Sequence, residues 1–283
     1  MTFTCSSNHF NLAQIADSGQ CFRLNRIGEN TYSVISAKKR ALVSQNGDCI
    51  SLDCPQEDLS FWKSYFDLDT DYRAFIESID PKDSYLTSAA RFGGGIRILR
   101  QDLWEMLITF VISQQKTIPM IQKLVEALCT AYGSPLADGS GFAFPTPKEL
   151  SKASLDDLLT LKLGYRAKYI KRLADEAADG TIDLAHLKTL SYPEAFAYLT
   201  NLYGIGKKVA NCVCLFGLHH IGAFPVDTWI ERILLREYFD EKKYRHIAKS
   251  HLNDVLVEDH FAKYSGYAGV LQQYIFFYER SLT

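Results

Sequence analysis

An α+β fold is predicted, in which an N-terminal antiparallel β-sheet domain is followed by a mainly α-helical domain. Two patterns lead to this prediction. Over residues 1–98, short runs of strand-forming residues alternate with turn residues. From residue 99 onward, apolar residues recur at three- and four-residue spacing, as they do on the buried face of a helix. We therefore expect two domains, at 1–98 and 99–283.

The first domain is expected to contain a sheet and one covering helix. Its strand-like runs lie at 30–36, 41–47 and 48–52. Between 57 and 66, the apolar Leu59, Trp62 and Phe66 recur at helical spacing. We expect this helix to cover one face of the sheet.

The second domain is expected to be helical nearly throughout. Its predicted helices are 103–112, 118–132, 155–161, 165–178, 192–202, 207–218, 228–238 and 267–281. The segment 133–147 is rich in Gly, Pro, Ser and Asp, and helical pattern resumes after it. It is therefore predicted to be a loop between helices and not a domain linker.

The composition restricts the classes of function. With 283 residues, of which 47% are hydrophobic, the chain can form two cores, and its net charge of −2 argues against binding nucleic acid through bulk positive charge. Any DNA site must be local. The seven cysteines follow no zinc or disulfide spacing, which favours a reducing compartment. With no leader peptide and no membrane-length apolar run, a soluble, intracellular protein is expected.

The most informative segment is the predicted hairpin at 192–218. One helix ends at Gly204-Ile205-Gly206, and a second helix starts at once. Two glycines allow a tight reversal, and the unpaired N–H groups at the start of the second helix could bind a phosphate. Taken alone, the turn is more typical of an ordinary αα-hairpin.

A second feature changes that interpretation. Asp227 follows Lys208 by 19 residues, in Pro-Val-Asp, at the N-cap of the helix predicted at 228–238. The Leu-X-Gly-Ile-Gly-X-Lys hairpin together with Pro-Val-Asp resembles the helix-hairpin-helix glycosylase superfamily, over about residues 99–283. The resemblance implies that Lys208 is the catalytic lysine and Asp227 the catalytic aspartate.

The chemistry of these two residue types agrees with the implied functions. A lysine attacks as a nucleophile only when its amine is uncharged, and burial and the positive end of a helix dipole both favour that form. Lys208 lies in the first turn of its helix, so we expect it to point into a pocket and its neighbour Lys207 to point to phosphate or solvent. An N-cap carboxylate such as Asp227 is already ionised and fixed in place.

The substrate is indicated by residues outside the hairpin. Branches with an iron–sulfur cluster carry four closely spaced cysteines after the aspartate, whereas this chain has no cysteine after Cys214, so no cluster is expected. The Ser-Gly-Gln-X-Phe-Arg sequence around Gly19 resembles 8-oxoguanine DNA glycosylases. In that family the glycine carbonyl accepts a hydrogen bond from N7–H, the donor that guanine lacks. Gly19 is thereby implied to discriminate between the two bases, although a lone Ser-Gly would more simply be a turn.

The same resemblance implies a base pocket built from two helices. Gln272 takes the place of the residue that contacts the Watson–Crick edge, and Phe276 that of the aromatic that stacks on the base. They are four residues apart and so share one helical face. Cys212, four residues after Lys208, is expected to face the other side of the base.

DNA contacts are expected from the hairpin and from two nearby segments. Lys162, Lys168, Lys171 and Arg172 join Arg166 in a basic cluster, which could also be a plain solvated face. Gln115 stands where the family commonly has Asn, Trp229 where better-known members have His, and Pro119 where they can have Arg. The implied DNA-binding residues are Gln115, Lys116, Tyr165, Arg166, Gly204, Gly206, Lys207 and Trp229.

The resemblance thus implies a bifunctional DNA glycosylase and abasic-site lyase of base excision repair, which flips 8-oxoguanine out of duplex DNA and removes it through a lysine Schiff base and β-elimination. No cofactor is required, although backbone carbonyls of Leu202 and Ile205 could bind a cation. A monomer acting in the cytoplasm or nucleoid, or in a nucleus, is expected. Two alternatives stay open: a glycosylase for alkylated bases, and a non-catalytic hairpin module that only binds DNA.

Overall fold

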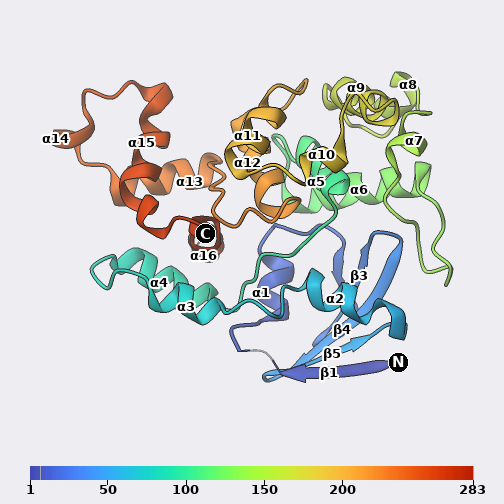
Figure 1. Ribbon diagram of the computed structural model, residues 1–283, viewed down its shortest axis with the longest axis horizontal. Coiled ribbons are helices and arrows are strands. Elements are labelled where there is room, and N and C mark those ends of the chain that lie inside the picture. Colours follow the sequence, from blue (N-terminus) through green and yellow to red (C-terminus); the bar gives the residue numbers. More distant parts are fainter. Residues whose placement is uncertain (7, 283) are drawn as a thin grey trace.

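The computed structural model describes residues 1–6 and 8–282, and it has the predicted α+β architecture, with an antiparallel sheet at its N-terminal end and helices after it (Figure 1). The five strands lie in the order β1-β5-β4-β3-β2, and each neighbouring pair is antiparallel. Their bounds are β1 Thr2–Ser6, β2 Leu24–Arg26, β3 Thr31–Ser36, β4 Lys39–Asn46 and β5 Cys49–Asp53. The three predicted strands are confirmed as β3, β4 and β5.

The register of the sheet follows from tight two-residue turns. Between β3 and β4, Ala37 and Lys38 both have positive φ, as the favoured hairpin turn requires. Alternate residues of β3 to β5 are therefore buried on one face, among them Val34, Val43 and Leu52.

Two helices cover that buried face instead of the single one predicted: α1 (Leu12–Asp17) and α2 (Leu59–Tyr65), with the short η1 (Gln56–Asp58) leading into α2. Trp62 of α2 and Phe66 just after it are fully buried in the same apolar cluster as the sheet residues, together with Ile15 of α1. The prediction that the helix at 57–66 covers the sheet is confirmed.

The remaining chain is helical. Its helices are α3 Tyr72–Glu77, α4 Ser84–Gly93, α5 Leu103–Ile112, α6 Ile118–Tyr132, α7 Pro147–Leu150, α8 Leu155–Thr160, α9 Arg166–Ala178, α10 Leu184–Leu187, α11 Tyr192–Thr200, α12 Lys207–Phe216, α13 Thr228–Ile233, η2 Leu234–Tyr238, α14 Glu241–Tyr244, α15 Lys249–Phe261, η3 Ala262–Tyr264 and α16 Ala268–Ser281. All eight predicted helices are present. The one predicted at 228–238 changes to a π-helical turn after Ile233.

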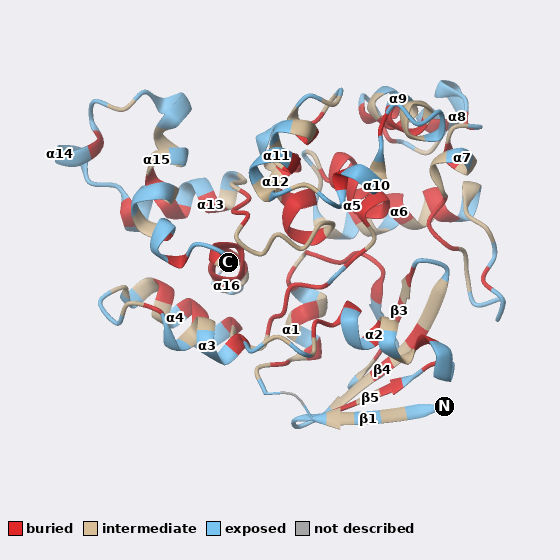
Figure 2. Cartoon of the chain, in the orientation of Figure 1, coloured by how far each residue is buried: buried red, intermediate tan, exposed pale blue. Residues whose placement is uncertain are grey.

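The centre of the helical part is α5, in which all ten residues are buried (Figure 2). It packs against α12, α6 and α9. Helices α3 and α4 precede residue 98, yet their buried residues belong to this larger core, and α4 packs along α16 (Figure 1). Among the described helices, none combines the length and apolar character needed to cross a bilayer.

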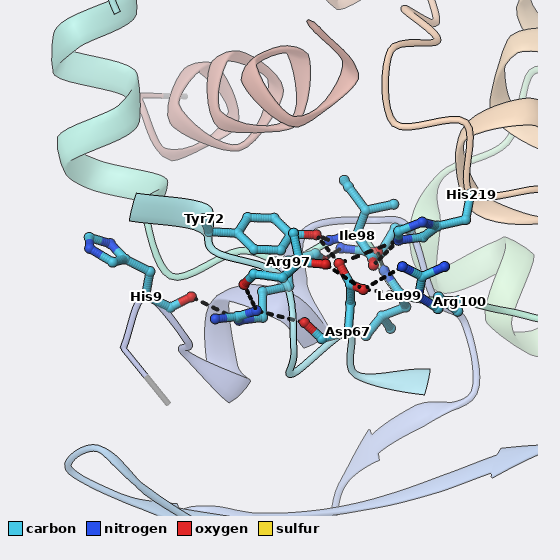
Figure 3. Close-up of polar contacts among 10 residues, drawn as sticks. His9, Asp67, Tyr72, Arg97, Ile98, Leu99, Arg100 and His219 are labelled. Carbon is cyan, nitrogen blue, oxygen red and sulfur yellow. Dashed lines mark hydrogen bonds and ion pairs between the residues drawn. The ribbon is translucent and has the colours of Figure 1, made fainter. Parts of the chain in front are cut away.

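A buried polar network joins the sheet part to the end of α12 (Figure 3). Asp67 accepts a hydrogen bond from Tyr72 Oη at 2.9 Å and forms an ion pair with Arg100 at 2.8 Å, and His219 Nε2 lies 3.5 Å from it. Burial alone would raise the pKa of Asp67, but the hydrogen bond and charge of His219, with Arg100, outweigh it and lower the pKa to about 2. Arg97 stacks on Tyr72 and donates to the Asp67 carbonyl at 2.6 Å.

Candidate active site

The helical hairpin forms at the predicted position, between α11 and α12. Gly204 has φ +83°, and a Cβ there would lie 2.5 Å from the ring of Tyr169, so only glycine allows this close approach. Gly206 is the N-cap of α12 and provides no side-chain cap. The first N–H groups of α12 are therefore left for solvent or an anion.

Lys208 and Lys207 point in different directions, as predicted. The Lys208 ammonium lies 5.2 Å from the ring centroid of Phe110 and donates to Ser113 Oγ at 3.4 Å. The Lys207 side chain is exposed and forms an ion pair with Asp254 of α15 at 2.7 Å. Only Lys208 therefore faces the interior between α5 and α12.

Asp227 is the N-cap of α13. Its Oδ1 accepts the backbone N–H of Trp229 at 3.0 Å and that of Ile230 at 2.9 Å. These two bonds fix the carboxylate at the positive end of the helix, where its negative charge is favoured. Asp227 is half-buried and lines the wall of a cavity.

Lys208 and Asp227 line two adjoining cavities. The wide cavity has a volume of about 690 Å³. The second, of about 50 Å³, is called the deep cavity because buried residues such as Cys212 and Gln272 line it. Both are lined by the same five residues: Gly19, Phe110, Lys208, Asp227 and Phe276. Segments far apart in the sequence thus meet at one place, with an amine and a carboxylate beside an aromatic ring.

The α16 helix presents one face to these cavities. Gln272, Gln273 and Phe276 line the deep cavity, and Arg280 lines the wide one, where its guanidinium lies 5.4 Å from the Phe276 ring. Cys212 lines the deep cavity from α12. Burial raises the pKa of the Cys212 thiol despite the nearby Lys208, so this residue presents a neutral, soft surface.

Gly19 enters the site from the segment between α1 and β2. Its φ is +79°, and a Cβ there would lie 3.0 Å from Ile118 Cδ1 and 3.4 Å from Phe276 Cε1. The predicted neighbours Gly19, Cys212, Gln272 and Phe276 are therefore brought together around one cavity.

The turn after α5 carries the predicted Gln115 and Lys116, and both line the wide cavity. Gln115 has φ +52°, which for a non-glycine residue needs support from its surroundings. That support comes from Gln114, whose Nε2 donates to the Gly204 carbonyl at 3.2 Å and whose own carbonyl accepts two bonds from Arg166. The turn and the hairpin are thereby coupled.

Arg166 requires a correction. It was predicted to contact DNA, but it is buried, and its guanidinium donates to the backbone carbonyls of Gln114 and Leu163. It therefore positions the turn and has no free surface for a phosphate. Its neighbour Tyr165, by contrast, is exposed and stacks on the same guanidinium.

The rest of the basic cluster is partly neutralised within α9. Lys171 pairs with Asp175 at 2.5 Å and Arg172 with Glu176 at 2.7 Å, each one turn away. Arg172 also stacks on the exposed Tyr203 beside the hairpin turn. Trp229 lines the wide cavity next to Asp227.

No group of three or more His, Cys, Asp and Glu side chains in the described chain is placed to hold a metal ion. At the hairpin, the Leu202 carbonyl accepts the N–H of Ile205 at 3.1 Å. A cation at Leu202 and Ile205 would use the remaining carbonyl lone pairs.

Several lining residues were not predicted from the sequence, among them Phe110, Ser113, Gln273 and Arg280. Phe110 and Ser113 lie in or just after the apolar α5, where an aromatic is expected in any core. The position of Gln273 and Arg280 on the face that carries Gln272 and Phe276 was a signal in the sequence, because residues three and four apart share a helical face.

Comparison with protein families gives two matches. The model for the 8-oxoguanine DNA glycosylase N-terminal domain matches residues 2–107, and the model for the HhH-GPD superfamily of base excision DNA repair proteins matches residues 108–256. Together they account for most of the chain.

Individual relatives agree. The N-glycosylase/DNA lyase of Saccharomyces cerevisiae is 33% identical over 262 residues, which cover 81% of this chain and 68% of the yeast protein. A structure of MBOgg1 with a low-affinity DNA ligand has a TM-score of 0.89 and 34% identity, covering 99% of this chain and 96% of that one. The Clostridium acetobutylicum 8-oxoguanine glycosylase/lyase, in complex with duplex DNA containing cytosine opposite 8-oxoguanine, has a TM-score of 0.88 and 32% identity, covering 100% and 98%.

Proposed function

The chain belongs to the HhH-GPD superfamily of base excision DNA repair proteins, with an 8-oxoguanine DNA glycosylase N-terminal domain, and we propose that it excises 8-oxoguanine from duplex DNA and then cleaves the strand at the abasic site. It is accordingly a DNA N-glycosylase with abasic-site lyase activity. The observation that carries this proposal is the meeting of Lys208 and Asp227, from two different helices, at one cavity beside Gly19 and Phe276.

The first chemical step forms one bond and breaks another at the same carbon. The uncharged Lys208 Nζ adds to C1′ of the flipped nucleotide while the electrons of the C1′–N9 bond leave with the purine. Positive charge develops on the sugar as the bond breaks, and the fixed carboxylate of Asp227 stabilises it. The departing purine takes up a proton, and the lysine nitrogen loses one.

The second step uses the link between lysine and sugar. Opening of the sugar ring gives a protonated Schiff base between Nζ and C1′, which draws electrons from the neighbouring C2′–H bond. Loss of that proton expels the 3′ phosphate by β-elimination and cuts the strand. Water then hydrolyses the Schiff base and restores Lys208.

Recognition of the base is divided among the pocket residues. Phe276 stacks on one face of the purine and Cys212 lies against the other, while Gln272 contacts the Watson–Crick edge. The Gly19 carbonyl accepts N7–H. Guanine has a lone pair at N7, so it would leave that buried carbonyl unpaired, at a cost of about 1–3 kcal/mol.

Duplex DNA binds across the hairpin and the 113–116 turn. The α12 N-terminus, with Gly204 and Gly206, contacts phosphate, and Lys207 adds a cation once it leaves Asp254. Gln115 fills the space vacated by the flipped base, and Tyr165 wedges beside it. Lys116 and Trp229 line the wide cavity.

The chemistry needs no cofactor, because Lys208 supplies the nucleophile and Asp227 the charge. A cation held by the Leu202 and Ile205 carbonyls would serve to bind a DNA phosphate and takes no part in the bond changes. We further propose that the enzyme acts as a monomer and works inside the cell, at the nucleoid of a prokaryote or in a nucleus.

The test is covalent trapping. Borohydride added during reaction with an 8-oxoguanine:cytosine duplex should reduce the Schiff base and leave protein attached to DNA. Lys208→Gln should abolish both trapping and strand cutting, whereas Lys207→Gln, the adjacent lysine, should still be trapped at saturating DNA. Trapping of Lys208→Gln at the wild-type level would refute the proposal. Binding of the duplex without any cutting by the wild-type protein would favour a non-catalytic hairpin module.

A further inference from the structure

A buried amide oxygen without a partner lies in the wall of the deep cavity. Gln273 is 4% exposed, and its Oε1 has no hydrogen-bond partner among residues 1–6 and 8–282. Its Nε2 donates to Gln272 Oε1 at 2.9 Å. Because Oε1 and Nε2 are attached to the same carbon, the bond to Gln272 directs Oε1 away from Gln272.

Leaving an amide carbonyl buried and unpaired is costly, so such an atom calls for an explanation. Several other buried side-chain atoms in the described chain also have no partner, among them Glu105 Oε2 and Tyr274 Oη. Gln273 alone among these residues lines either of the two cavities that Lys208 and Asp227 share. Its unpaired oxygen is therefore placed to be satisfied by a ligand of that site.

The edge of a guanine-type base offers the complementary groups. It carries two adjacent donors, N1–H and the 2-amino group, next to the acceptor O6. An amide oxygen accepts two hydrogen bonds. Gln272 Oε1 already accepts one from Gln273. It can therefore take one donor of the base, and the neighbouring donor requires a second acceptor.

We propose that Gln273 is a specificity-determining residue of the base pocket, whose Oε1 accepts the 2-amino group of the flipped purine while its Nε2 holds Gln272 Oε1 toward N1–H. This inference rests on the proposed excision of 8-oxoguanine. The pair of glutamines then selects purines with donors at both positions 1 and 2. Gly19, at the opposite edge of the base, selects for oxidation.

The test pairs a change in the base with a change in the protein. 8-Oxohypoxanthine keeps N1–H, O6, N7–H and O8 of 8-oxoguanine and lacks only the 2-amino group. Single-turnover excision of both bases, each opposite cytosine, is measured for the wild type and for Gln273→Met, which keeps the length of the side chain without an acceptor. The ratio of the two excision rates is compared between the wild type and the variant, so differences in leaving-group chemistry between the two bases cancel.

The wild type should prefer 8-oxoguanine by about two- to tenfold, the range given by one neutral hydrogen bond, and Gln273→Met should bring this ratio close to one. Gln45→Met, the same change in the remote sheet, should keep the wild-type ratio. If Gln273→Met does not fold by circular dichroism, Gln273→Asn gives the same test, because it withdraws the carbonyl by one methylene.

An unchanged ratio in the folded Gln273 variant would overturn the inference, whether both rates stayed the same or fell together. Equal losses on both bases would mean that Gln273 only orients Gln272, and equal rates would mean that a water satisfies its oxygen. A wild-type protein inactive on 8-oxoguanine would instead reject the proposed function itself.

Discussion

Replacing Gly19 by alanine tests how the site distinguishes 8-oxoguanine from guanine. The backbone at Gly19 has φ +79°, and an alanine Cβ would lie 3.0 Å from Ile118 Cδ1 and 3.4 Å from Phe276 Cε1. The left-handed conformation costs a non-glycine residue about 1–2 kcal/mol. The close contacts also require the backbone or the two side chains to move by a few tenths of an ångström.

Both effects act on the Gly19 carbonyl, which we propose accepts N7–H. A hydrogen bond is weakened by small changes in distance and angle, and losing one between neutral groups costs about 1 kcal/mol. If the carbonyl were then left buried and unpaired, the cost would rise to about 1–3 kcal/mol. We therefore expect Gly19→Ala to reduce the preference for 8-oxoguanine over guanine by roughly tenfold.

The assay is single-turnover excision from matched duplexes that contain either 8-oxoguanine or guanine opposite cytosine. Gly180→Ala is the matched control, because Gly180 has φ +87° and no neighbouring atom within 4 Å of a Cβ. It should lose a similar amount of stability and keep the full preference. If Gly19→Ala also kept the full preference while Phe276→Ala lost it, the assignment of discrimination to Gly19 would be wrong.

Three further predictions concern the carboxylate, the aromatic wall and the buried network. Asp227→Asn keeps a good N-cap, so the melting temperature should stay nearly unchanged. The excision rate should fall far more than the affinity for DNA. Equal losses in rate and affinity would mean that Asp227 acts only as a helix cap. Phe276→Ala should slow excision, because it removes base stacking worth about 1–3 kcal/mol. The preference for the lesion over guanine should change little, because every purine offers a similar face. Asp67→Asn should lower the free energy of unfolding by about 2 kcal/mol at neutral pH, since the pKa of Asp67 falls from 3.8 to about 2 on folding. A carboxylate with a lowered pKa stabilises the fold above pH 4 and loses that contribution as the pH falls toward 2. The difference in unfolding free energy between the wild type and the Asp67→Asn variant, measured with urea, should therefore shrink in that window, and a constant difference down to pH 2 would contradict the prediction.

Features set by local sequence could be predicted before the structure. The Gly-Ile-Gly turn, the N-cap Asp227 and the spacing of Gln272 and Phe276 each depend on a few neighbouring residues, and the structure contains all three. The order of sheet and helices followed in the same way from periodicity. Most of the predicted site residues therefore meet at one pair of cavities.

Features set by tertiary packing could not be predicted. Arginine is usually exposed, so the burial of Arg166 under Tyr165 was not visible in the sequence. Helix α15 was missed because its apolar residues form no regular stripe. The significance of Gln273 depends on an unpaired oxygen, and only the full set of hydrogen bonds around it reveals that.

Under the proposed function, the placement of Gly19 makes selectivity depend on both halves of the chain. Its neighbours Ser18 and Gln20 are fully buried, and the Gln20 amide donates to the Arg97 carbonyl at 2.9 Å and accepts the N–H of Leu99 at 2.8 Å. Arg97 is fixed in turn by the network around Asp67, which reaches His219 just after α12 (Figure 3). The Gly19 segment is thus connected through buried polar contacts to His219, just after the helix that carries Lys208. If N7–H is contacted by Gly19 as we propose, this connection allows a residue from the N-terminal half to select the base on which the helical half acts.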